Sequence, residues 1–370
     1  MTEHAMDPHD TGAVEGAYAV VVPTLGRPSL AATLRALAAA EGPQPERVIL
    51  VDDRPGPDGG TPLPVEIPAA LRPLTTVVRG EARGPAAARN TGWRAAGRVP
   101  WIVFLDDDVV PGATWCDDLA LDLAAAAASE EGAVGAVTAR IEVPLPADRR
   151  PTDWERNTAG LATARWITAD MAYRREALET VGGFDERFRR AFREDADLAL
   201  RALAAGWSVT AGTRTTAHPV RPADRWISVR LQRGNADDVL MTRLHGRDWW
   251  TRAAAPRGRL PRHLAVTAAA LATLGCAALR KPAATAVCAT AWLAGTAEFA
   301  LARVLPGPRD REEMLTMAMT SVLIPPAAVW HWLRGQVVHR GATPLDPYAD
   351  PHGHPPAPPL RLAGEERIRR

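Results

Sequence analysis

The chain has little cysteine, little lysine and little net charge, and the first and the last of these each exclude a class of protein. Its 3 cysteines among 370 residues show no Cys-x-x-Cys or Cys/His ligand spacing, which argues against a disulfide framework or a structural zinc site and suits a reducing cytoplasm. Lys281 is the only lysine, so arginine carries nearly all of the basic charge. The formal net charge of +1 excludes a globally basic nucleic-acid binder.

The two ends of the chain differ in composition from its middle. Residues 1–16 are polar and acidic and lack the basic and apolar regions of a signal peptide, so we expect a disordered lead-in. Residues 341–370 are rich in proline, which predicts a disordered tail. The hydrophobic fraction of 46% over the whole chain is sufficient for a sizeable core between these ends.

Residues 17–223 alternate between strand-like and helical patterns. Apolar runs predict strands, and apolar positions three or four apart predict helices. The predicted strands cover residues 18–22, 48–51, 76–78, 101–105, 133–141 and 164–173. The predicted helices cover residues 30–41, 85–96, 112–129 and 195–205. Residues 54–73 are expected to form a loop, and residues 142–160 a polar connection. This alternation predicts an α/β fold with a mostly parallel sheet and helices on both faces.

Acidic residues follow two of these strands at the point where each strand ends. Asp52 and Asp53 close the second strand, and Asp106, Asp107 and Asp108 close the strongly apolar fourth strand. The carboxyl ends of parallel strands meet at one edge of a sheet, where α/β proteins bind ligands. Because unpaired carboxylates are costly there, we expect a cation to offset them. A divalent metal holding a phosphorylated ligand is the leading candidate.

The last third of the chain is helical in pattern. Residues 224–262 form a connecting segment rich in Arg and Trp, and residues 263–340 contain apolar stretches over 264–279, 283–305 and 314–333. Each stretch is short, dominated by alanine or interrupted by charge, whereas a bilayer span takes roughly 20 apolar residues. Two arrangements stay open. The helices form either a bundle packed on the first domain or, as we favour, a hairpin in or on a membrane with flanking arginines at anionic headgroups.

Six short motifs in order over residues 17–220 resemble the signature of family 2 glycosyltransferases. They are VVPTLGR at 21–27, VDD at 51–53, ARNTG at 88–92, FLDDD at 104–108, GGFDE at 182–186 and EDADL at 194–198. The resemblance implies a Rossmann-like GT-A fold, a nucleotide-sugar donor and inversion at the anomeric carbon. The family usually continues the second motif with Gly-Ser, whereas this chain has Arg54 and Pro55, so we expect a differently shaped loop.

The resemblance also implies which residues bind the donor and its metal. Asp106 and Asp108, joined by His218, are implied ligands of Mg²⁺ or Mn²⁺, and Asp107 is an implied partner of the ribose, with the choice of two metal ligands among the three aspartates open. Carboxylates are the hard oxygen ligands that such ions prefer, and the ion would offset the charge of the leaving diphosphate. Further donor contacts are implied for Pro23, Thr24, Asp52 and Asp53. Arg83 and Arg89 are candidates to bind the donor through a phosphate or to support the acidic rim.

An inverting transfer requires a base that deprotonates the acceptor hydroxyl as it attacks. The family places this base in an acidic pair at the start of a helix, which here is Glu194 and Asp195, and we assign the role to Asp195. The positive end of the helix would favour its ionised form. The resemblance places Asp170 beside the transferred sugar or the acceptor, and we expect Trp226 to stack on a sugar ring.

Other enzyme classes stay open on the acidic triplet alone. It also fits the nucleophile motif of a haloacid-dehalogenase-type phosphohydrolase or the metal site of a nucleotidyltransferase. We expect instead a metal-dependent transfer of a sugar from a UDP-, dTDP- or GDP-sugar to a glycan, lipid-linked or small-molecule acceptor, in the synthesis of cell-surface glycans or glycolipids. The expected location is the cytoplasm, at the inner face of the cell membrane, with no nucleic-acid partner.

Overall fold

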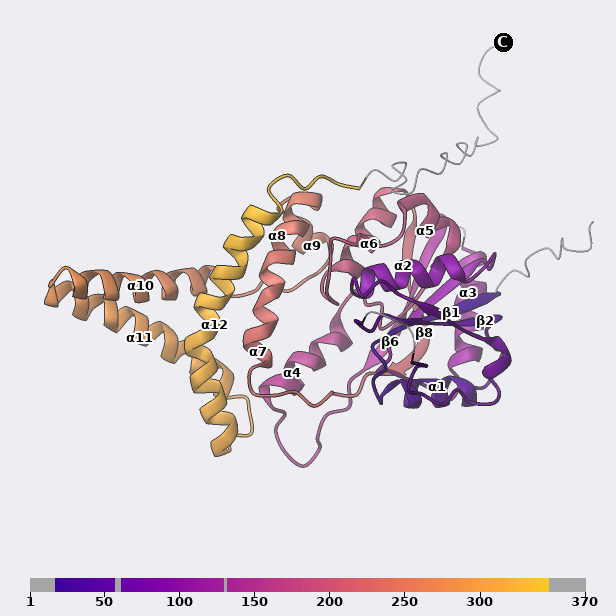
Figure 1. The fold of residues 1–370 in the computed structure, drawn as a ribbon, viewed down its shortest axis with the longest axis horizontal. Helices are drawn as coiled ribbons and strands as arrows, with labels where there is room; N and C mark the ends of the chain where they lie inside the picture. The colour runs from indigo at the N-terminus through magenta and orange to yellow at the C-terminus, as the bar shows by residue number, and fades with distance from the viewer. Residues whose placement is uncertain (1–16, 57–60, 130–131, 346–370) are drawn as a thin grey trace, which may run out of the picture.

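The structure, a computed structural model, describes residues 17–56, 61–129 and 132–345. The expected lead-in, residues 1–16, and residues 346–370 of the expected tail lie outside the described residues. The described chain folds into an α/β domain followed by long helices that extend away from it (Figure 1). The predicted fold class and the separate helical C-terminal region are confirmed.

One sheet runs through the α/β domain. Its strands are β1 (Tyr18–Thr24), β2 (Arg47–Asp52), β3 (Thr75–Arg79), β4 (Trp101–Leu105), β5 (Val110–Pro111), β6 (Val134–Glu142), β7 (Asp170–Arg174) and β8 (Ser208–Ala217). They lie in the order β3-β2-β1-β4-β7-β6-β8-β5. The half made of β1 to β4 is parallel, whereas β7 enters antiparallel between β4 and β6, so the sheet as a whole is mixed.

The strand before the three aspartates is central in the sheet. All of β4 is buried, and it pairs with β1 on one side and β7 on the other. Its pairing ends with Leu105 opposite Asp170, so the chain turns away from the sheet at Asp106. Where β1 pairs with β2, Thr24 at the end of β1 lies opposite Asp52 at the end of β2. The parallel half therefore brings three polar strand ends to one rim.

Helices cover both faces of the sheet. In the α/β domain and the segment after it they are α1 (Leu30–Ala39), α2 (Pro85–Ala95), α3 (Trp115–Ala127), α4 (Asp153–Ala159), α5 (Arg175–Val181), α6 (Glu194–Ala204), α7 (Ile227–Arg230), α8 (Gly234–His245) and α9 (Trp249–Arg252), with 3₁₀ turns η1 (Arg72–Leu74), η2 (Gly160–Thr163) and η3 (Leu231–Arg233). Val20 and Val22 of β1 share a core with α1 and α3, while Ala19 and Val21 share the opposite core with α2 and α6. This alternation is what a strand buried on both faces requires.

Several segments differ from the sequence prediction, which included neither α5 nor β8. The strand predicted over 164–173 starts only at Asp170, which lies opposite Leu105, the last residue of its partner β4. The connection predicted over 142–160 contains α4, which begins with a capping box between Thr152 and Glu155. Each of these two side chains accepts a hydrogen bond from the backbone N–H of the other residue. The Thr-x-x-Glu signature was present in the sequence and could have predicted this helix.

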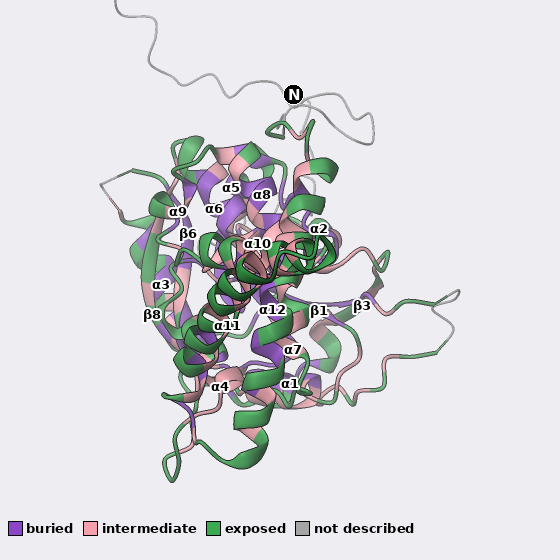
Figure 2. Ribbon diagram, turned by 90° about the vertical axis from the view of Figure 1, so that its left-hand side faces the viewer, coloured by how far each residue is buried: buried purple, intermediate pink, exposed green. Residues whose placement is uncertain are grey.

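Three long helices form the C-terminal region: α10 (Leu260–Ala278), α11 (Pro282–Val304) and α12 (Arg311–Val338). α10 and α11 form a hairpin that projects from the α/β domain, whereas α12 runs along α8 (Figure 1). Figure 2 shows the hairpin as largely exposed, and Leu271, Leu274 and Leu293 are among its exposed apolar side chains. Within the part of the chain that the structure describes, these three helices are long and apolar enough to cross a membrane.

A buried arginine joins the helical region to the α/β domain. Arg303, near the end of α11, is 7% exposed and donates to Asp153 Oδ2 of α4 at 2.7 Å. It also donates to Thr320 Oγ1 of α12 at 2.7 Å and to Ser228 Oγ of α7 at 3.1 Å. Because a buried charge is costly to leave unpaired, this network fixes the base of the hairpin against three other helices.

Candidate active site

The three aspartates after β4 do not share one environment. Asp107 turns back into the domain and is 2% exposed. Its Oδ2 accepts a hydrogen bond from Thr24 Oγ1 at 2.6 Å, and its Oδ1 accepts one from Arg27 Nη1 at 2.8 Å. Asp106 and Asp108 on either side belong to a separate cluster. Asp107 therefore ties the end of β4 to the end of β1, and both of its oxygens have partners within the chain.

Asp106, Asp108 and His218 form a cluster in which one ligand atom from each residue lies within 4.8 Å of the others. His218 follows β8, and the pairing of β8 with β5 brings its Nε2 to 3.8 Å from Asp108 Oδ1. Burial and the nearby charge of Asp106 raise the pKa of Asp108, as happens where two carboxylates converge. Two carboxylates and an imidazole are suitable ligands for a divalent cation such as Mn²⁺.

An arginine that the sequence did not single out lies against this cluster. Arg221 is on the same loop as His218, and its Nε is 2.7 Å from Asp108 Oδ2. Its backbone carbonyl accepts a hydrogen bond from the indole N–H of Trp154 in α4, at 2.7 Å. The guanidinium partly offsets the charge of the aspartates. Arginine is so frequent in this chain that its position after His218 carried no signal by itself.

Asp52 and Asp53 lie at the same rim, but their own loops engage them. Asp53 accepts hydrogen bonds from two backbone N–H groups in the loop 82–84, at 2.7 and 3.1 Å. Asp52 accepts from Arg54 Nη2 at 2.7 Å and from Arg79 Nη1 at 3.0 Å. The side-chain hydrogen bond from Arg54 is the main cause that lowers the pKa of Asp52. Asp53 thus anchors the loop that leads into α2, and Arg54 holds Asp52 in place.

Asp106, Asp108 and His218 form the metal-suited cluster, and Arg89 connects this cluster to α6. This residue of α2 is 1% exposed and donates to Asp106 Oδ1 at 2.7 Å and to Glu194 Oε1 at 2.9 Å. Glu194 is also buried, and its burial and the adjacent Asp195 carboxylate raise the pKa of Glu194 to about 8, although Arg89 acts in the opposite direction. Arg89 therefore lies behind the rim, where it neutralises carboxylates from two separate elements.

Asp195 lies in the first turn of α6. The residue before this helix, Arg193, has a left-handed backbone with φ of +77°, a conformation that is costly for a residue with a Cβ. Burial is the largest cause that raises the pKa of Asp195, and the charge of Asp106 adds to it. The helix that bears Asp195 is linked to Asp106 through Arg89, which bonds both Glu194 and Asp106. A raised pKa suits a group that must accept a proton.

Asp170, predicted beside the sugar or the acceptor, lies in the core instead. It is 0% exposed, and its Oδ1 accepts from Arg214 Nε at 2.9 Å. Its Oδ2 accepts from Trp115 Nε1 and from Thr216 Oγ1, each at 2.6 Å. Arg214 is equally buried and also pairs with Asp122 at 3.0 Å. A carboxylate so enclosed does not fit the predicted contact with a substrate, and it holds β7, β8 and α3 together.

The remaining predicted residues are Arg83, Trp226 and Pro23. Arg83 pairs with Glu81 and Glu186 at 2.8 and 2.9 Å. Trp226 is 40% exposed at the start of α7. Pro23 precedes Thr24 in β1. Their roles toward a donor or an acceptor stay predictions.

A family model described as glycosyl transferase family 2 matches residues 19–193. This segment is a family 2 glycosyltransferase domain. The match contains the strand β4 with its three aspartates and ends directly before α6. The enzyme is thus a glycosyltransferase, and neither the phosphohydrolase nor the nucleotidyltransferase that the acidic triplet also allowed.

Several solved structures are similar to this glycosyltransferase. They include the mannosyltransferase PcManGT from Pyrobaculum calidifontis in complex with GDP-Man and Mn²⁺, with 19% identity, 86% of each chain covered and a TM-score of 0.49. S. aureus TarS 1–349 with UDP-GlcNAc has 14% identity over 88% of this chain and 91% of TarS, with a TM-score of 0.39. GalNAc-T7 with UDP, GalNAc and Mn²⁺ has 14% identity over 63% of this chain and 52% of its own, with a TM-score of 0.41. No curated protein sequence matches the chain.

Proposed function

We propose that the glycosyltransferase moves a sugar from a nucleoside-diphosphate donor to an acceptor hydroxyl, with inversion at the anomeric carbon and with Mg²⁺ or Mn²⁺ as cofactor. One observation carries the proposal. A cluster suited to a metal lies at the rim of the parallel strands, and Arg89 links it to the helix that bears the candidate base Asp195. The family supplies the reaction class, and this arrangement supplies its two chemical requirements.

Asp106, Asp108 and His218 are the proposed metal ligands. Their ligand atoms lie within 4.8 Å of one another, and their chemistry suits a hard divalent cation. When bound there, such an ion offsets the charge of the diphosphate leaving group as a Lewis acid. Asp107 is left out of the ligand set, because Thr24 and Arg27 already occupy its oxygens. It would instead keep its two neighbours in register.

Asp195 is the proposed base. Burial strengthens the basicity of its carboxylate, while the positive charges of Arg89 and Arg193 keep the ionised form accessible. Glu194 stays bonded to Arg89 and would position the helix rather than react. Arg89 therefore joins Asp106, one of the proposed metal ligands, to Glu194, the residue before the proposed base, and this link would keep the acceptor and the donor in a constant relation.

The nucleoside end of the donor would lie over the ends of β1 and β2. Pro23, Thr24, Asp52 and Asp53 form this part of the rim. Because Thr24 donates to Asp107 and both aspartates accept hydrogen bonds from nearby loops, we expect them to shape this end mainly through the backbone that they fix. Arg221, beside Asp108, would face the diphosphate.

We also propose that α10, α11 and α12 attach the enzyme to the inner face of the cell membrane, where the acceptor would be a glycan or a lipid-linked glycan. Leucines of the α10–α11 hairpin are exposed over more than half of their surface, an arrangement that water disfavours. Arginines are dense in the segment 247–262 before the hairpin, whereas Arg280 and Lys281 stand at its tip. This asymmetry is typical of helices whose more basic flank stays in the cytoplasm.

Two substitutions test the chemistry. Asp195→Asn should lower turnover by about 10²- to 10⁴-fold, as loss of a general base does, and leave metal-dependent nucleotide affinity unchanged. Asp108→Ala should weaken that affinity in calorimetric titrations with Mn²⁺ and UDP, GDP or dTDP. Asp148→Asn, an exposed residue, is the matched control. Normal turnover in Asp195→Asn would exclude it as the base, and unchanged affinity in Asp108→Ala would exclude it as a metal ligand.

Membrane attachment has its own test. A membrane fraction washed with alkaline carbonate should retain the full-length chain, because the apolar helices hold it without relying on charge. Release of all of the protein by the wash would reject an embedded hairpin.

A further inference from the structure

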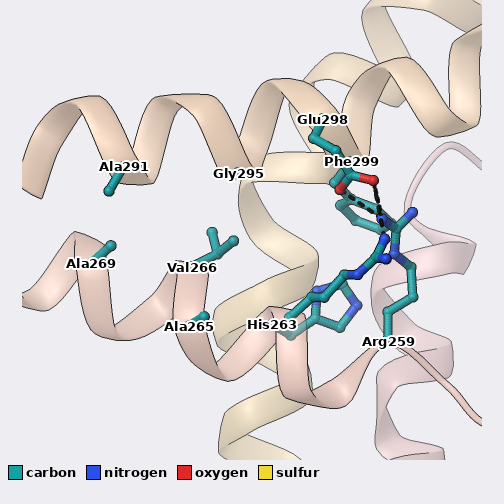
Figure 3. Close-up of a pocket in the computed structure, with 10 residues that line it drawn as sticks. Arg259, His263, Ala265, Val266, Ala269, Ala291, Gly295, Glu298 and Phe299 are labelled. Carbon is teal, nitrogen blue, oxygen red and sulfur yellow. Dashed lines mark hydrogen bonds and ion pairs between the residues drawn. The ribbon is translucent and has the colours of Figure 1, made fainter.

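A cleft of about 430 Å³ lies between α10 and α11. Its walls are short apolar side chains from both helices, as Figure 3 shows for Ala265, Val266, Ala269 and Ala291. The two helices approach each other closely at Gly295, where a Cβ would lie 2.6 Å from Val266 Cγ2. The cleft is therefore a slot between helices that small residues keep open, and its volume lies in the range of about 300–1,000 Å³ that is common for ligand sites.

Charged groups gather at one end of this slot. Arg259 forms an ion pair with Glu298, and Arg262 lies 3.2 Å from the same carboxylate while 69% of its side chain stays exposed. An adjoining cavity of about 480 Å³ shares Arg259 and Arg262 as walls and adds Arg257. Three guanidinium groups therefore line the two cavities against one carboxylate, an excess of two positive charges.

We propose that these two cavities bind one membrane phospholipid with an anionic head group. The phosphate would lie among Arg257, Arg259 and Arg262, and one acyl chain would fill the slot between α10 and α11. The inference rests on the membrane attachment proposed above. It adds a specific lipid site that lies outside the donor site, because none of the lining residues belongs to the α/β domain.

The shape and the charge of the two cavities favour this occupant over others. A free phosphate would use the guanidinium groups and leave the apolar slot without a partner, and a neutral lipid would leave the positive excess unmatched. The charged end is at the start of α10, next to the arginine-rich segment, which is where a head group would lie if the hairpin enters the bilayer. Arginine suits phosphate because its planar fork can donate two parallel hydrogen bonds.

The test measures binding to the purified full-length chain in a neutral detergent. The probe is dihexanoyl-phosphatidylglycerol, compared with dihexanoyl-phosphatidylcholine, which has the same chains, and with inorganic phosphate, which has no chain. We expect phosphatidylglycerol to bind at least about tenfold more tightly than either, since only it uses both cavities. Equal binding of phosphate would show a simple anion site, and equal binding of phosphatidylcholine would show an apolar slot without head-group recognition. Either result overturns the proposal.

Three variants separate the head-group site from the slot. The triple variant Arg257→Gln, Arg259→Gln, Arg262→Gln should lose the preference, as should Ala269→Phe with Ala291→Phe, which fills the slot without changing charge. The exposed arginines Arg35, Arg98 and Arg140 provide a matched triple Gln control with the same loss of charge. If this control loses as much affinity, general electrostatic attraction explains the binding and the site is rejected. The same holds if the slot-filling variant keeps full affinity.

Further readouts keep the result independent of folding and of the proposed function. Arg262→Gln alone removes an exposed guanidinium group. It should still weaken phosphatidylglycerol binding several-fold, even if the triple variant fails to fold. Mass measurement in detergent should give a monomer, and a dimer that the slot-filling variant dissociates would identify a second copy of the chain as the occupant. Metal-dependent nucleotide binding is measured in the same samples. If it persists while lipid preference is absent, the lipid site alone is wrong.

Discussion

Substitution of Asp170 by asparagine distinguishes a structural carboxylate from one that meets substrate. The change keeps the shape of the side chain but removes its charge opposite Arg214, which is 0% exposed. If the new amide nitrogen faces Arg214, two donors oppose each other, and if it faces Trp115 and Thr216, it opposes two other donors. No rotamer satisfies all three partners. Asp170→Asn therefore breaks a buried ion pair whichever way the amide turns.

The expected cost follows from the burial of both partners. Breaking a buried pair by removing one charge costs about 3–5 kcal/mol. In a domain of this size, 1 kcal/mol shifts Tm by roughly 2–4 °C, so we expect Tm to fall by roughly 6–20 °C. Thermal unfolding measures this loss, and exposed Asp148→Asn should leave Tm unchanged. Sugar transfer per folded molecule should stay near that of the native chain. A native Tm with abolished transfer would refute the structural role and restore the predicted contact with substrate.

Three further predictions concern other parts of the molecule. The folded-state pKa of Glu194 is raised to about 8, so its contribution to stability is complete below about pH 4.5 and is lost as the pH rises toward 8. The urea concentration at the midpoint of unfolding should therefore fall over this pH range. Glu194→Gln should make that fall smaller. Gly183→Ala should destabilise the domain by more than about 1 kcal/mol in urea titrations, since φ is +78° and the new Cβ would lie 2.4 Å from Asn90 Oδ1; an unchanged midpoint would contradict this. Arg303→Met should lower Tm because Asp153 loses its closer arginine partner and keeps only Arg156 at 3.3 Å, and Asp153→Asn in the same chain should recover part of the loss.

Sequence patterns predicted the parallel half of the sheet because its strands carry their own evidence. The runs that became β1, β2 and β4 are apolar at nearly every position, as strands buried on both faces must be. The other half, in which β7 and β5 are antiparallel to their neighbours, was harder to predict. β7 begins opposite the last residue of β4, and nothing within residues 164–173 encodes the end of β4. A strand boundary set by a neighbour cannot be found in the strand itself.

The site shows the same division between local and distant information. The spacing of Asp106 and Asp108 is local, and the structure brings His218 to them as the resemblance implied. Asp107 is also an aspartate and lies between them in the sequence. Only its hydrogen bond with Thr24 shows that its role differs from theirs. Arg221 and the enclosure of Asp170 depend on contacts across more than 40 positions of the sequence. Such contacts become visible only when the chain is folded.

The Arg303 network also decides where this chain can be cut. Removing α10 to α12 to obtain a soluble enzyme would delete Arg303, the closer partner of Asp153, and leave that carboxylate at the start of α4 with Arg156 at 3.3 Å. That helix carries Trp154, whose indole holds the backbone of Arg221 beside Asp108. Removal of these helices would therefore disturb the metal-suited cluster through α4, Trp154 and Arg221. A truncated enzyme should carry Asp153→Asn, so that the cut surface presents a neutral amide in place of a carboxylate that has lost its closer partner.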